Sequence, residues 1–346
     1  MIDLYVVESP LQALSAAEAK VENGKDVDSV ILVRKAGEKR LISDDQIAKA
    51  VSFGNWDKVV WFDFSEYSGL SYHLLAIWYL IKLKRAYHGR VRKLYIGEFR
   101  SEWMLYLRCA ISPLTTYLLD DGAATVTIQN RYLSRGVYWF NGAKESAFKS
   151  IVKRLLYLPV YNRQVARSPI NLFTAFELSP APDQEIVRHS FGLIRNSSES
   201  FVRCHEVFYF GAKYSEAGIM ALEDEMKFLK EVSIYYQKKG LRMVYVPHRD
   251  DSCTKISIIS DVLGLSIKKM DCPAELYFAM TGHRPYRVSA AYSSVLNNLR
   301  FLFGCEVCDS FIIPGSMING KFSSNISAVY KYYRDIGLNV IDLDAA

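Results

Sequence analysis

MIDLYVVESPLQ, which spans Met1–Gln12, is the stretch that decides the fold, because it predicts a strand that leads directly into a helix. Leu4–Val7 is an apolar run typical of a buried strand. Ser9 is a suitable N-cap for the helix, and Pro10 fits the first helical position, where no backbone N–H is needed. Apolar residues then recur at helical spacing, at Leu11, Leu14 and Ala17–Ala19. The chain therefore opens as a strand–helix unit, from which parallel sheets are built.

The same alternation continues outward through the first third of the chain. Further strands are predicted at Val30–Val33, Lys58–Phe62, Leu94–Gly97 and Thr115–Leu119. Helices are predicted at Leu70–Tyr87 and Glu98–Cys109. Strands that alternate with helices in this way favour right-handed crossovers and a parallel sheet covered on both faces.

The pattern loosens between Val126 and Ser200 and then begins again. Leu178–Asp183 contains two prolines and is typical of a connector. The second series of strands is predicted at Glu206–Phe210, Arg242–Val246, Leu265–Lys268, Arg287–Ala290 and Ser310–Ile313. Its helices are predicted at Glu216–Lys239, Pro273–Met280, Ser293–Phe301 and Ser323–Asp335. We therefore expect an α/β protein with two Rossmann-like domains facing a cleft, residues 1–180 and 181–346, and ligands at the carboxyl ends of the strands.

Length, composition and charge narrow the functional classes. The chain has 346 residues, half of them hydrophobic, which is typical of a soluble globular protein with two domains. The net charge of +6 suits an anionic donor, an anionic glycan or an acidic membrane surface, and falls short of the clustered basicity of a nucleic-acid binder. Neither a Walker loop nor a GxGxxG motif is present, which argues against an ATPase or a nicotinamide dehydrogenase. No signal peptide or membrane-spanning apolar run is evident, so we expect a cytoplasmic protein.

Two carboxylates follow the predicted strand Thr115–Leu119, at Asp120 and Asp121, and Gly122 permits a tight turn after them. Paired carboxylates in a cleft can raise the pKa of one partner, which can then act as a general base. Sugar transfer needs such a base to deprotonate the acceptor hydroxyl. The alternative is a strand-ending turn, in which aspartate is common.

A second polar group follows the strand Arg242–Val246, at Pro247, His248 and Arg249. An imidazole in a cleft could assist the departure of a phosphate leaving group, and an arginine could neutralise its charge. The alternative is a pair of surface residues at the end of a strand.

Two predicted helix starts carry further candidates. Glu275 could accept hydrogen bonds from two ribose hydroxyls, or could simply stabilise the helix dipole. Ser293 and Ser294 place two hydroxyls beside the free N–H groups of a helix start, which favours a phosphate; the alternative is plain N-capping.

Taken in order, these motifs resemble those of the bacterial sialyltransferases, which carry an acidic-acidic-Gly motif, a His-Pro motif and a Ser-Ser or Ser-Thr motif. Tyr5–Gln12 is similar to the starts of lipooligosaccharide and capsule sialyltransferases, and Phe208–Gly211 to the first strand and glycine loop of their second domain. One departure is that Pro247-His248-Arg249 stands where the family has His-Pro. A longer stretch resembles the donor-binding half of the multifunctional sialyltransferases, with residues at matching spacing. These are Glu275, Met280-Thr281-Gly282, Pro285, Val288, Ser293-Ser294 and Leu299.

The resemblance implies a GT-B fold and an inverting transfer from a CMP-activated sugar, with no metal or other cofactor. Asp121 would be the general base with Asp120 beside it. His248 would contact the donor phosphate. The remaining donor-side residues would be Glu275 for the ribose, Ser293 and Ser294 for the phosphate, and Arg249, Pro247 and Gly211; the acceptor side would hold Ser9, Gln12 and Gly122.

We therefore expect transfer of sialic acid or a related nonulosonic sugar to a bacterial surface glycan, on lipooligosaccharide, O-antigen or capsule. The basic stretches Ile81–Lys93 and Phe148–Arg167 fit a solvated helix face or a peripheral contact with anionic lipid at the inner membrane. Other donors remain alternatives: CMP-Kdo, CMP-legionaminate, CMP-pseudaminate, a UDP-hexose or a CDP-polyol. A non-catalytic nucleotide- or glycan-binding subunit of polysaccharide assembly is the alternative from another class.

Overall fold

The computed structural model describes residues 1–24, 27–35, 41–140, 152–153, 155–195, 200–202, 205–281 and 283–343. Gly282 and residues 148–151 and 154 of the basic stretch therefore lie outside the described residues. The chain divides into two compact units, Met1–Leu193 and Ile194–Ala346. The predicted boundary after residue 180 falls before β7 (Ile186–Arg188), a strand of the first unit's sheet.

Seven described strands form the parallel sheet of the first unit, in the order β3-β2-β1-β4-β5-β6-β7. The strand order changes direction between β1 and β4, and in open parallel sheets ligands bind at the carboxyl ends beside such a switch point. The other strand bounds are β1 Ile2–Val7, β2 Asp28–Arg34, β3 Lys58–Phe62, β4 Val91–Ile96, β5 Thr115–Leu118 and β6 Asn171–Thr174.

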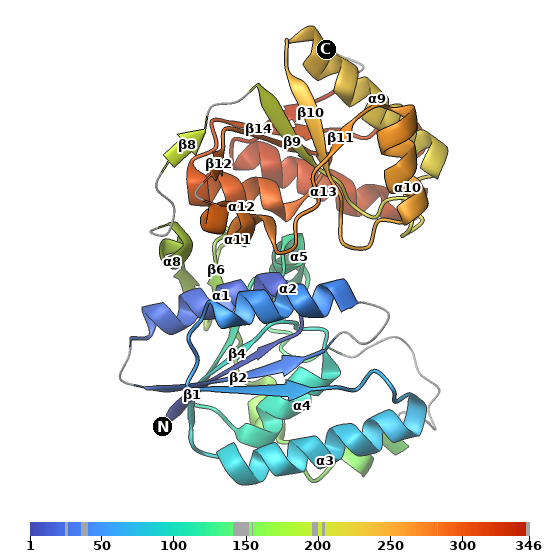
Figure 1. Ribbon diagram of the computed structural model, residues 1–346. Helices are drawn as coiled ribbons and strands as arrows, with labels where there is room; N and C mark the ends of the chain where they lie inside the picture. Colours follow the sequence, from blue (N-terminus) through green and yellow to red (C-terminus); the bar gives the residue numbers. More distant parts are fainter. Residues whose placement is uncertain are drawn as a thin grey trace. The chain divides into compact units, whose positions relative to one another are not determined.

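Helices cover both faces of this sheet. Figure 1 shows α1 and α2 on one face and α3 on the other, as right-handed crossovers require when the chain moves first one way and then the other. The helix bounds are α1 Pro10–Glu22, α2 Leu41–Ser52, α3 Gly69–Tyr87, α4 Glu102–Ile111, α5 Ala123–Arg131, the short η2 Leu133–Arg135 and α7 Arg163–Arg167, with α8 Gly192–Arg195 at the boundary between the units.

Alternate residues of the first unit's strands pack into two layers. Leu4 and Val6 belong to a core formed with α3 and α4. Tyr5, on the other face of β1, stacks on Tyr95 of β4 with ring centroids 4.8 Å apart, and Tyr95 stacks on Tyr117 of β5 at 5.1 Å. These stacked rings bind the three central strands together just below the carboxyl edge.

The second unit repeats this design. Six described strands form a parallel sheet in the order β11-β10-β9-β13-β14-β15, with the switch point between β9 and β13. Their bounds are β9 Glu206–Phe210, β10 Arg242–Val246, β11 Ser266–Ile267, β13 Arg287–Ala290, β14 Val307–Phe311 and β15 Asn339–Ile341; a separate two-stranded sheet joins β8 Ser200–Val202 to β12 His283–Pro285.

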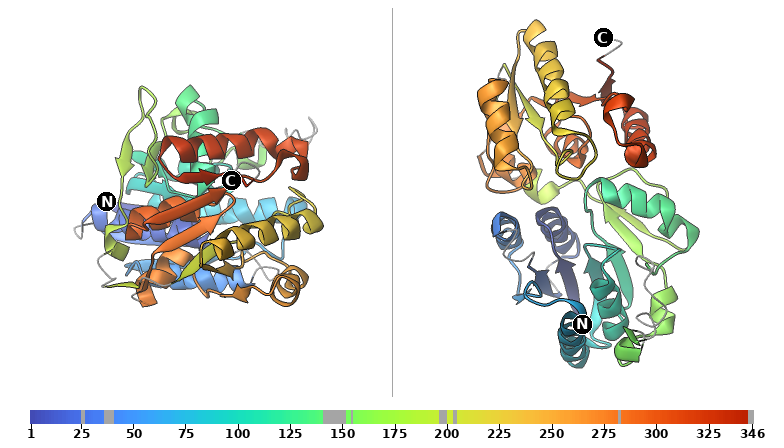
Figure 2. Two further views of the ribbon diagram at one scale, coloured as in Figure 1. Left: turned by 90° about the horizontal axis from the view of Figure 1, so that it is seen from above. Right: turned by 90° about the vertical axis from the view of Figure 1, so that its right-hand side faces the viewer.

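The helices of the second unit also lie on both sides of its sheet. Figure 2 shows α9 and α10 on one side and α13 on the other. Tyr209 and Tyr245 share a core with α9, whereas Phe208 packs on Phe278 of α11, with ring centroids 5.4 Å apart. The bounds are α9 Leu222–Lys238, α10 Cys253–Ser257, α11 Ala274–Thr281, α12 Ser294–Phe303 and α13 Gly320–Asp335, with short turns η3 Ile258–Val262 and η4 Gly315–Met317.

The predicted α/β class with two Rossmann-like units is confirmed. Three helix starts are wrong: α4 begins at Glu102 rather than Glu98, α9 at Leu222 rather than Glu216, and α13 at Gly320 rather than Ser323, because Asn319 caps it. In the second case Gly218 has a φ of 64°, which interrupts any helix. Four strands have the predicted bounds: Lys58–Phe62, Glu206–Phe210, Arg242–Val246 and Arg287–Ala290.

Candidate functional site

Asp121 lies just beyond the carboxyl end of β5, where Gly122 turns the chain with a φ of 66°. The Ser9 hydroxyl donates to Asp121 Oδ1 over 3.2 Å, and the Asp121 backbone N–H donates to Thr125 Oγ1 over 3.0 Å. Ser9 follows β1 and is the predicted N-cap of α1, where its Oγ accepts from Gln12 N over 3.3 Å. Predicted acceptor-side residues from the ends of β1 and β5 therefore meet beside the switch point.

The surroundings of Asp121 favour its protonated form. Burial raises the pKa of Asp121 above its ordinary value of 3.8, and the negative charge of Glu98 raises it further. Hydrogen bonds from Gln12 and Ser9 act in the opposite direction, as does the charge of Arg100. A carboxylate with a raised pKa accepts a proton more readily than a free one, which suits it to general-base catalysis.

Two glutamates flank Asp121, and each is paired with an arginine. Glu98 follows β4 and accepts two hydrogen bonds from the Arg100 guanidinium, over 3.0 and 2.8 Å. Glu8 follows β1 and lies 3.1 Å from Arg34 at the end of β2. Burial raises the pKa of Glu8, and the charge of Arg34 opposes that effect. The edge of the first sheet is therefore a row of carboxylates, each held in place.

Asp120 has different surroundings from Asp121. Its carboxylate is buried and accepts from the Thr174 hydroxyl over 2.5 Å and from Ala175 N over 2.8 Å. His189 Nε2 lies 3.5 Å from the same carboxylate. Asp120 therefore joins β5 to the end of β6, while the raised pKa of Asp121 comes from burial and Glu98.

Gln12 occupies a space that only glycine leaves open. Its Oε1 accepts from Glu8 N over 2.8 Å, and its side chain is 1% exposed. A Cβ atom at Gly97 would lie 2.1 Å from Gln12 Oε1. The glycine after β4 thus admits the side chain that connects the β1 loop to Asp121.

In the second unit, His248 follows β10 after Pro247, and Arg249 beside it is exposed. The Asp250 backbone N–H donates to His248 Nδ1 over 3.1 Å. A ring nitrogen that accepts carries no proton, so the neutral ring holds its proton on Nε2. Burial lowers the pKa of His248 below its ordinary value of 6.5, and the charge of Arg249 lowers it further. His248 is therefore a neutral Nε2–H donor at neutral pH.

Asp251 fixes the backbone of His248. Its Oδ2 accepts from His248 N over 2.9 Å and from Tyr245 Oη over 2.8 Å. Its Oδ1 lies 3.0 Å from Nζ of Lys255, whose side chain is completely buried. The Asp251 carboxylate, paired with Lys255, therefore fixes the loop after β10.

Lys255 is the centre of a buried ionic cluster. Its Nζ pairs with Glu225 and Glu216 as well as Asp251, and donates to the Ala212 carbonyl over 2.7 Å. Burial lowers the pKa of Lys255, but the charges of Glu225 and Asp251 outweigh burial and leave that pKa above 10.5. Since Ala212 follows β9, the cluster joins the loops after β9 and β10.

Gly211 is the first residue of the loop after β9, and it leaves as little room for a Cβ atom as Gly97 does. A Cβ atom at Gly211 would lie 2.1 Å from Tyr245 Oη, and Gly211 N donates to the Val246 carbonyl over 2.9 Å. The predicted glycine loop therefore packs directly on the tyrosine that holds Asp251.

Ser293 follows β13, next to the switch point, and is the N-cap of α12. Its Oγ accepts from Val295 N over 3.4 Å, and Ser294 is the first residue of the helix. Glu275, in the first turn of α11, is 4% exposed and accepts from Asn298 Nδ2 over 2.7 Å. Burial raises the pKa of Glu275. Gly211, His248 and Ser293 thus follow adjacent strands, whereas Glu275 lies on a helix packed against α12.

Sequence reasoning missed Glu98, Arg100, Asp251 and Lys255. Glu98 and Arg100 directly follow β4, so the rule that selected Asp121 could have found them. Asp251 and Lys255 are four residues apart, which is the spacing of a helical ion pair. Among the described residues, no three His, Cys, Asp or Glu side chains form a group that could hold a metal ion.

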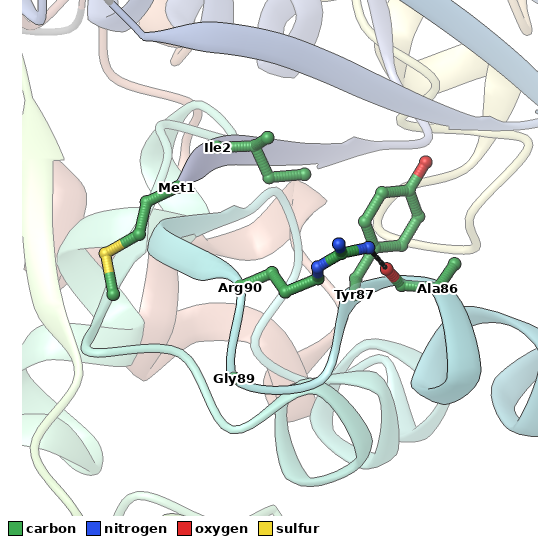
Figure 3. A pocket seen from close by; sticks show the side chains of 6 residues that line it. All are labelled: Met1, Ile2, Ala86, Tyr87, Gly89 and Arg90. Atoms are coloured by element: carbon green, nitrogen blue, oxygen red, sulfur yellow. Dashed lines mark hydrogen bonds between the residues drawn. The ribbon is translucent and has the colours of Figure 1, made fainter.

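Open pockets occur at the opposite edges of both sheets. One of about 360 Å³ lies at the amino ends of β1 and β4, between Ile2, Tyr87 and Arg90 (Figure 3). Another, of about 340 Å³, lies beside Arg242 at the amino end of β10. With the exception of Glu275 on α11, the predicted site residues lie in or next to the loops at the carboxyl ends, where folds of this class bind ligands.

Two parallel α/β units, each with a switch point, define the class of the molecule as the GT-B fold, and solved structures agree. The α/β-galactoside α-2,3-sialyltransferase of Photobacterium phosphoreum has a TM-score of 0.54 at 12% identity, covering 99% of this chain and 98% of that one. Staphylococcus aureus MnaA with UDP has a TM-score of 0.53 at 10% identity, covering 95% and 83%. UDP-GlcNAc 2-epimerase of Methanocaldococcus jannaschii has a TM-score of 0.51 at 8% identity, covering 99% and 89%.

These likenesses, at 12% identity or less, establish the fold. No protein-family model matches the sequence, and no curated protein matches it. In the described part of the chain, each helix is too short or too polar to cross a membrane.

Proposed function

We propose that this protein is an inverting glycosyltransferase that moves sialic acid or a related nonulosonic sugar from a CMP donor to a bacterial surface glycan. The observation that carries the proposal is Asp121, a carboxylate with a raised pKa that is oriented by Ser9 at the switch point of the first sheet. Similarity of the fold to a sialyltransferase supports the same class of reaction.

In this proposal Asp121 accepts the proton of an acceptor hydroxyl. The acceptor oxygen then forms a bond to the anomeric carbon of the donor sugar, and the bond from that carbon to the CMP phosphate oxygen breaks. The bonding electrons leave with the phosphate, so CMP departs as a monoester. Displacement in line inverts the anomeric centre, and positioning supplies much of the rate.

The second unit supplies the groups for the departing nucleotide. His248 offers its Nε2–H to a phosphate oxygen, and the free backbone N–H groups at the start of α12 support the charge with Ser293 and Ser294. Arg249 contributes a positive charge. Glu275 would accept from the ribose hydroxyls, which requires it to exchange its bond with Asn298.

Because these donors stabilise the negative charge of the departing phosphate, we propose a reaction that needs no metal ion. We also propose that the protein works in the cytoplasm and contacts anionic lipid at the inner membrane. Lipid-linked glycans of lipooligosaccharide, O-antigen or capsule are the acceptors that this placement favours.

The test is thermal stabilisation by CMP, CDP, UDP, GDP and ADP in the presence of a chelator. A ligand at 100 times its dissociation constant stabilises the folded state by about 2.7 kcal/mol, so CMP should raise the Tm and the others should not. Ser293→Ala together with Glu275→Gln should abolish the shift, whereas Ser327→Ala together with Glu231→Gln, at exposed positions on α13 and α9, is the matched control. Stabilisation by UDP or GDP alone would refute the CMP donor.

A UDP-sugar donor is the second candidate, because the fold is similar to that of Staphylococcus aureus MnaA solved with UDP. It makes a different prediction in the same assay, namely that UDP stabilises and CMP does not. The nucleotide that produces the shift then selects the sugar donors to be tested for turnover.

A further inference from the structure

α3 has an apolar outer face. Leu70, Leu74 and Trp78 are 62%, 50% and 48% exposed, and a spacing of four residues aligns them along the helix. The inner face is buried through Ala76, Ile77, Leu80 and Leu83. The solvent side of a surface helix ordinarily carries polar residues, so this apolar stripe indicates an interaction surface.

A second segment is fastened along the flank of α3. His73 Nδ1 is hydrogen-bonded to Tyr157 Oη over 3.0 Å, and Lys84 Nζ donates to the Pro159 carbonyl over 2.8 Å. The two contacts lie eleven positions apart on α3, which holds residues 155–161 beside the helix.

This segment extends the apolar face. Leu155 and Leu158 are 62% and 60% exposed. Together with the stripe on α3 they form what we term the α3 surface: Leu70, Leu74, Trp78, Leu155 and Leu158. Five large exposed apolar side chains on two segments that are tied together exceed the scattered exposure that a monomer normally shows.

The charges on α3 itself are all positive: the helix contains Lys82, Lys84 and Arg85 and no Asp or Glu. In the flanking segment, Lys153 is paired with Glu102. Lys82 Nζ lies 3.6 Å from the centre of the Trp78 ring, so a cation borders the apolar stripe directly. Two copies of this face would repel each other, whereas an anionic layer would be attracted.

We infer that the α3 surface docks on an anionic lipid membrane. The leucines and Trp78 lie in the boundary between headgroups and acyl chains, and Lys82 and Arg85 lie against lipid phosphates. The inference specifies the surface for the membrane contact proposed above, and it is independent of the donor nucleotide.

The test is co-sedimentation of the full chain with phosphatidylcholine vesicles, with and without phosphatidylglycerol. The protein should bind the anionic vesicles and not the neutral ones. Leu74→Ser with Trp78→Ser should weaken binding at least about ten-fold, because two half-exposed apolar side chains are lost. Lys82→Ser with Arg85→Ser should weaken it about 30-fold, from about 1 kcal/mol for each charge.

Val262→Ser is the matched control, since Val262 is an apolar residue 73% exposed in the second unit, and it should leave vesicle binding unchanged. Nucleotide-induced stabilisation should also be equal in all variants, which separates this test from that of the donor. Equal vesicle binding by the wild type and both double variants would overturn the inference. So would a dimer in sedimentation analysis that Leu74→Ser with Trp78→Ser converts to a monomer.

Discussion

The carboxyl edges of the two sheets carry their candidate groups in opposite electrostatic settings. In the first unit Asp121 is held by hydroxyl and amide groups beside Glu98, and burial raises its pKa. In the second unit Asp251, which pairs with Lys255, accepts from the His248 backbone N–H, and burial lowers the pKa of His248. Burial therefore moves both groups toward the uncharged form.

In the proposed reaction, this difference gives the two edges different roles. The edge with carboxylates would provide the proton acceptor, and the edge with the neutral imidazole would provide the hydrogen-bond donor. The two edges also differ in how they are built. The first relies on the Gln12 side chain packed against Gly97, and the second on the Lys255–Asp251 ion pair, whose carboxylate holds Tyr245 and the His248 backbone. Substitutions in each edge can test this contrast.

The largest expected effect is on turnover. Asp121→Asn removes the proposed base and should lower kcat by about 10²–10⁴-fold, with stabilisation by CMP retained. Asp63→Asn, an exposed carboxylate after β3, is the control and should keep full activity. Steady-state kinetics with a soluble acceptor measure both. An Asp121→Asn enzyme with wild-type kcat would remove Asp121 from the mechanism.

The next effect is on stability. Lys255→Met leaves Glu225 and Asp251 buried without their cation, and should cost about 3–5 kcal/mol. Arg188→Met breaks a surface pair with Glu177, in which the two side chains are 46% and 65% exposed, and should cost less than about 1 kcal/mol. Urea unfolding measures both changes. Equal losses of stability in the two variants would show that the Lys255 cluster does not stabilise the carboxyl edge of the second sheet.

A smaller effect is expected at the two crowded glycines. Gly211→Ala would push against the buried Tyr245 ring and should cost about 1–3 kcal/mol. Gly97→Ala should cost less, because the end of the Gln12 side chain can move aside. Gly320→Ala is the control, since a Cβ atom there meets nothing within 4 Å. Thermal melting ranks the three variants, and a Gly97→Ala protein less stable than Gly211→Ala would reverse the proposed order.

The smallest effect is a pH dependence of opposite sign in the two units. His248 has a folded pKa below 6.5, so the unfolded chain binds its proton first, and stability is lost as pH falls through 6.5. Asp121 has a folded pKa above 3.8, so its contribution is present at low pH and is lost as pH rises through 3.8. His248→Gln and Asp121→Asn should each flatten their own part of the Tm profile against pH. A profile that both variants leave unchanged would contradict these shifts.

The sequence predicted strand ends better than it predicted contacts. Strands such as Arg242–Val246 have the predicted bounds, because burial on both faces requires a continuous apolar run, here Met243–Val246. The short strands β6 and β7 were missed, since four and three residues carry little pattern. Helix α4 was predicted to begin at Glu98, which instead pairs with Arg100 before the helix.

Contacts between distant residues explain most of what the sequence could not predict in the candidate site. Ser9 and Asp121 are 112 positions apart, and only the pairing of β1, β4 and β5 brings them together. The raised pKa of Asp121 was predicted from Asp120 beside it, whereas burial and Glu98 produce it. Which side chain faces which depends on register, and that is a property of the folded sheet.

All strand pairs described in both sheets are parallel, and this feature sets the course of folding. A parallel pair cannot form through a tight turn, so each pairing must wait until a whole connecting segment has collapsed. During synthesis the first sheet remains incomplete until Arg188, the last residue of β7, has left the ribosome. β5 presents an unpaired edge until β6 emerges, and β6 then presents one until β7 pairs with it. The nascent chain therefore passes through an aggregation-prone stage that a chaperone could shorten.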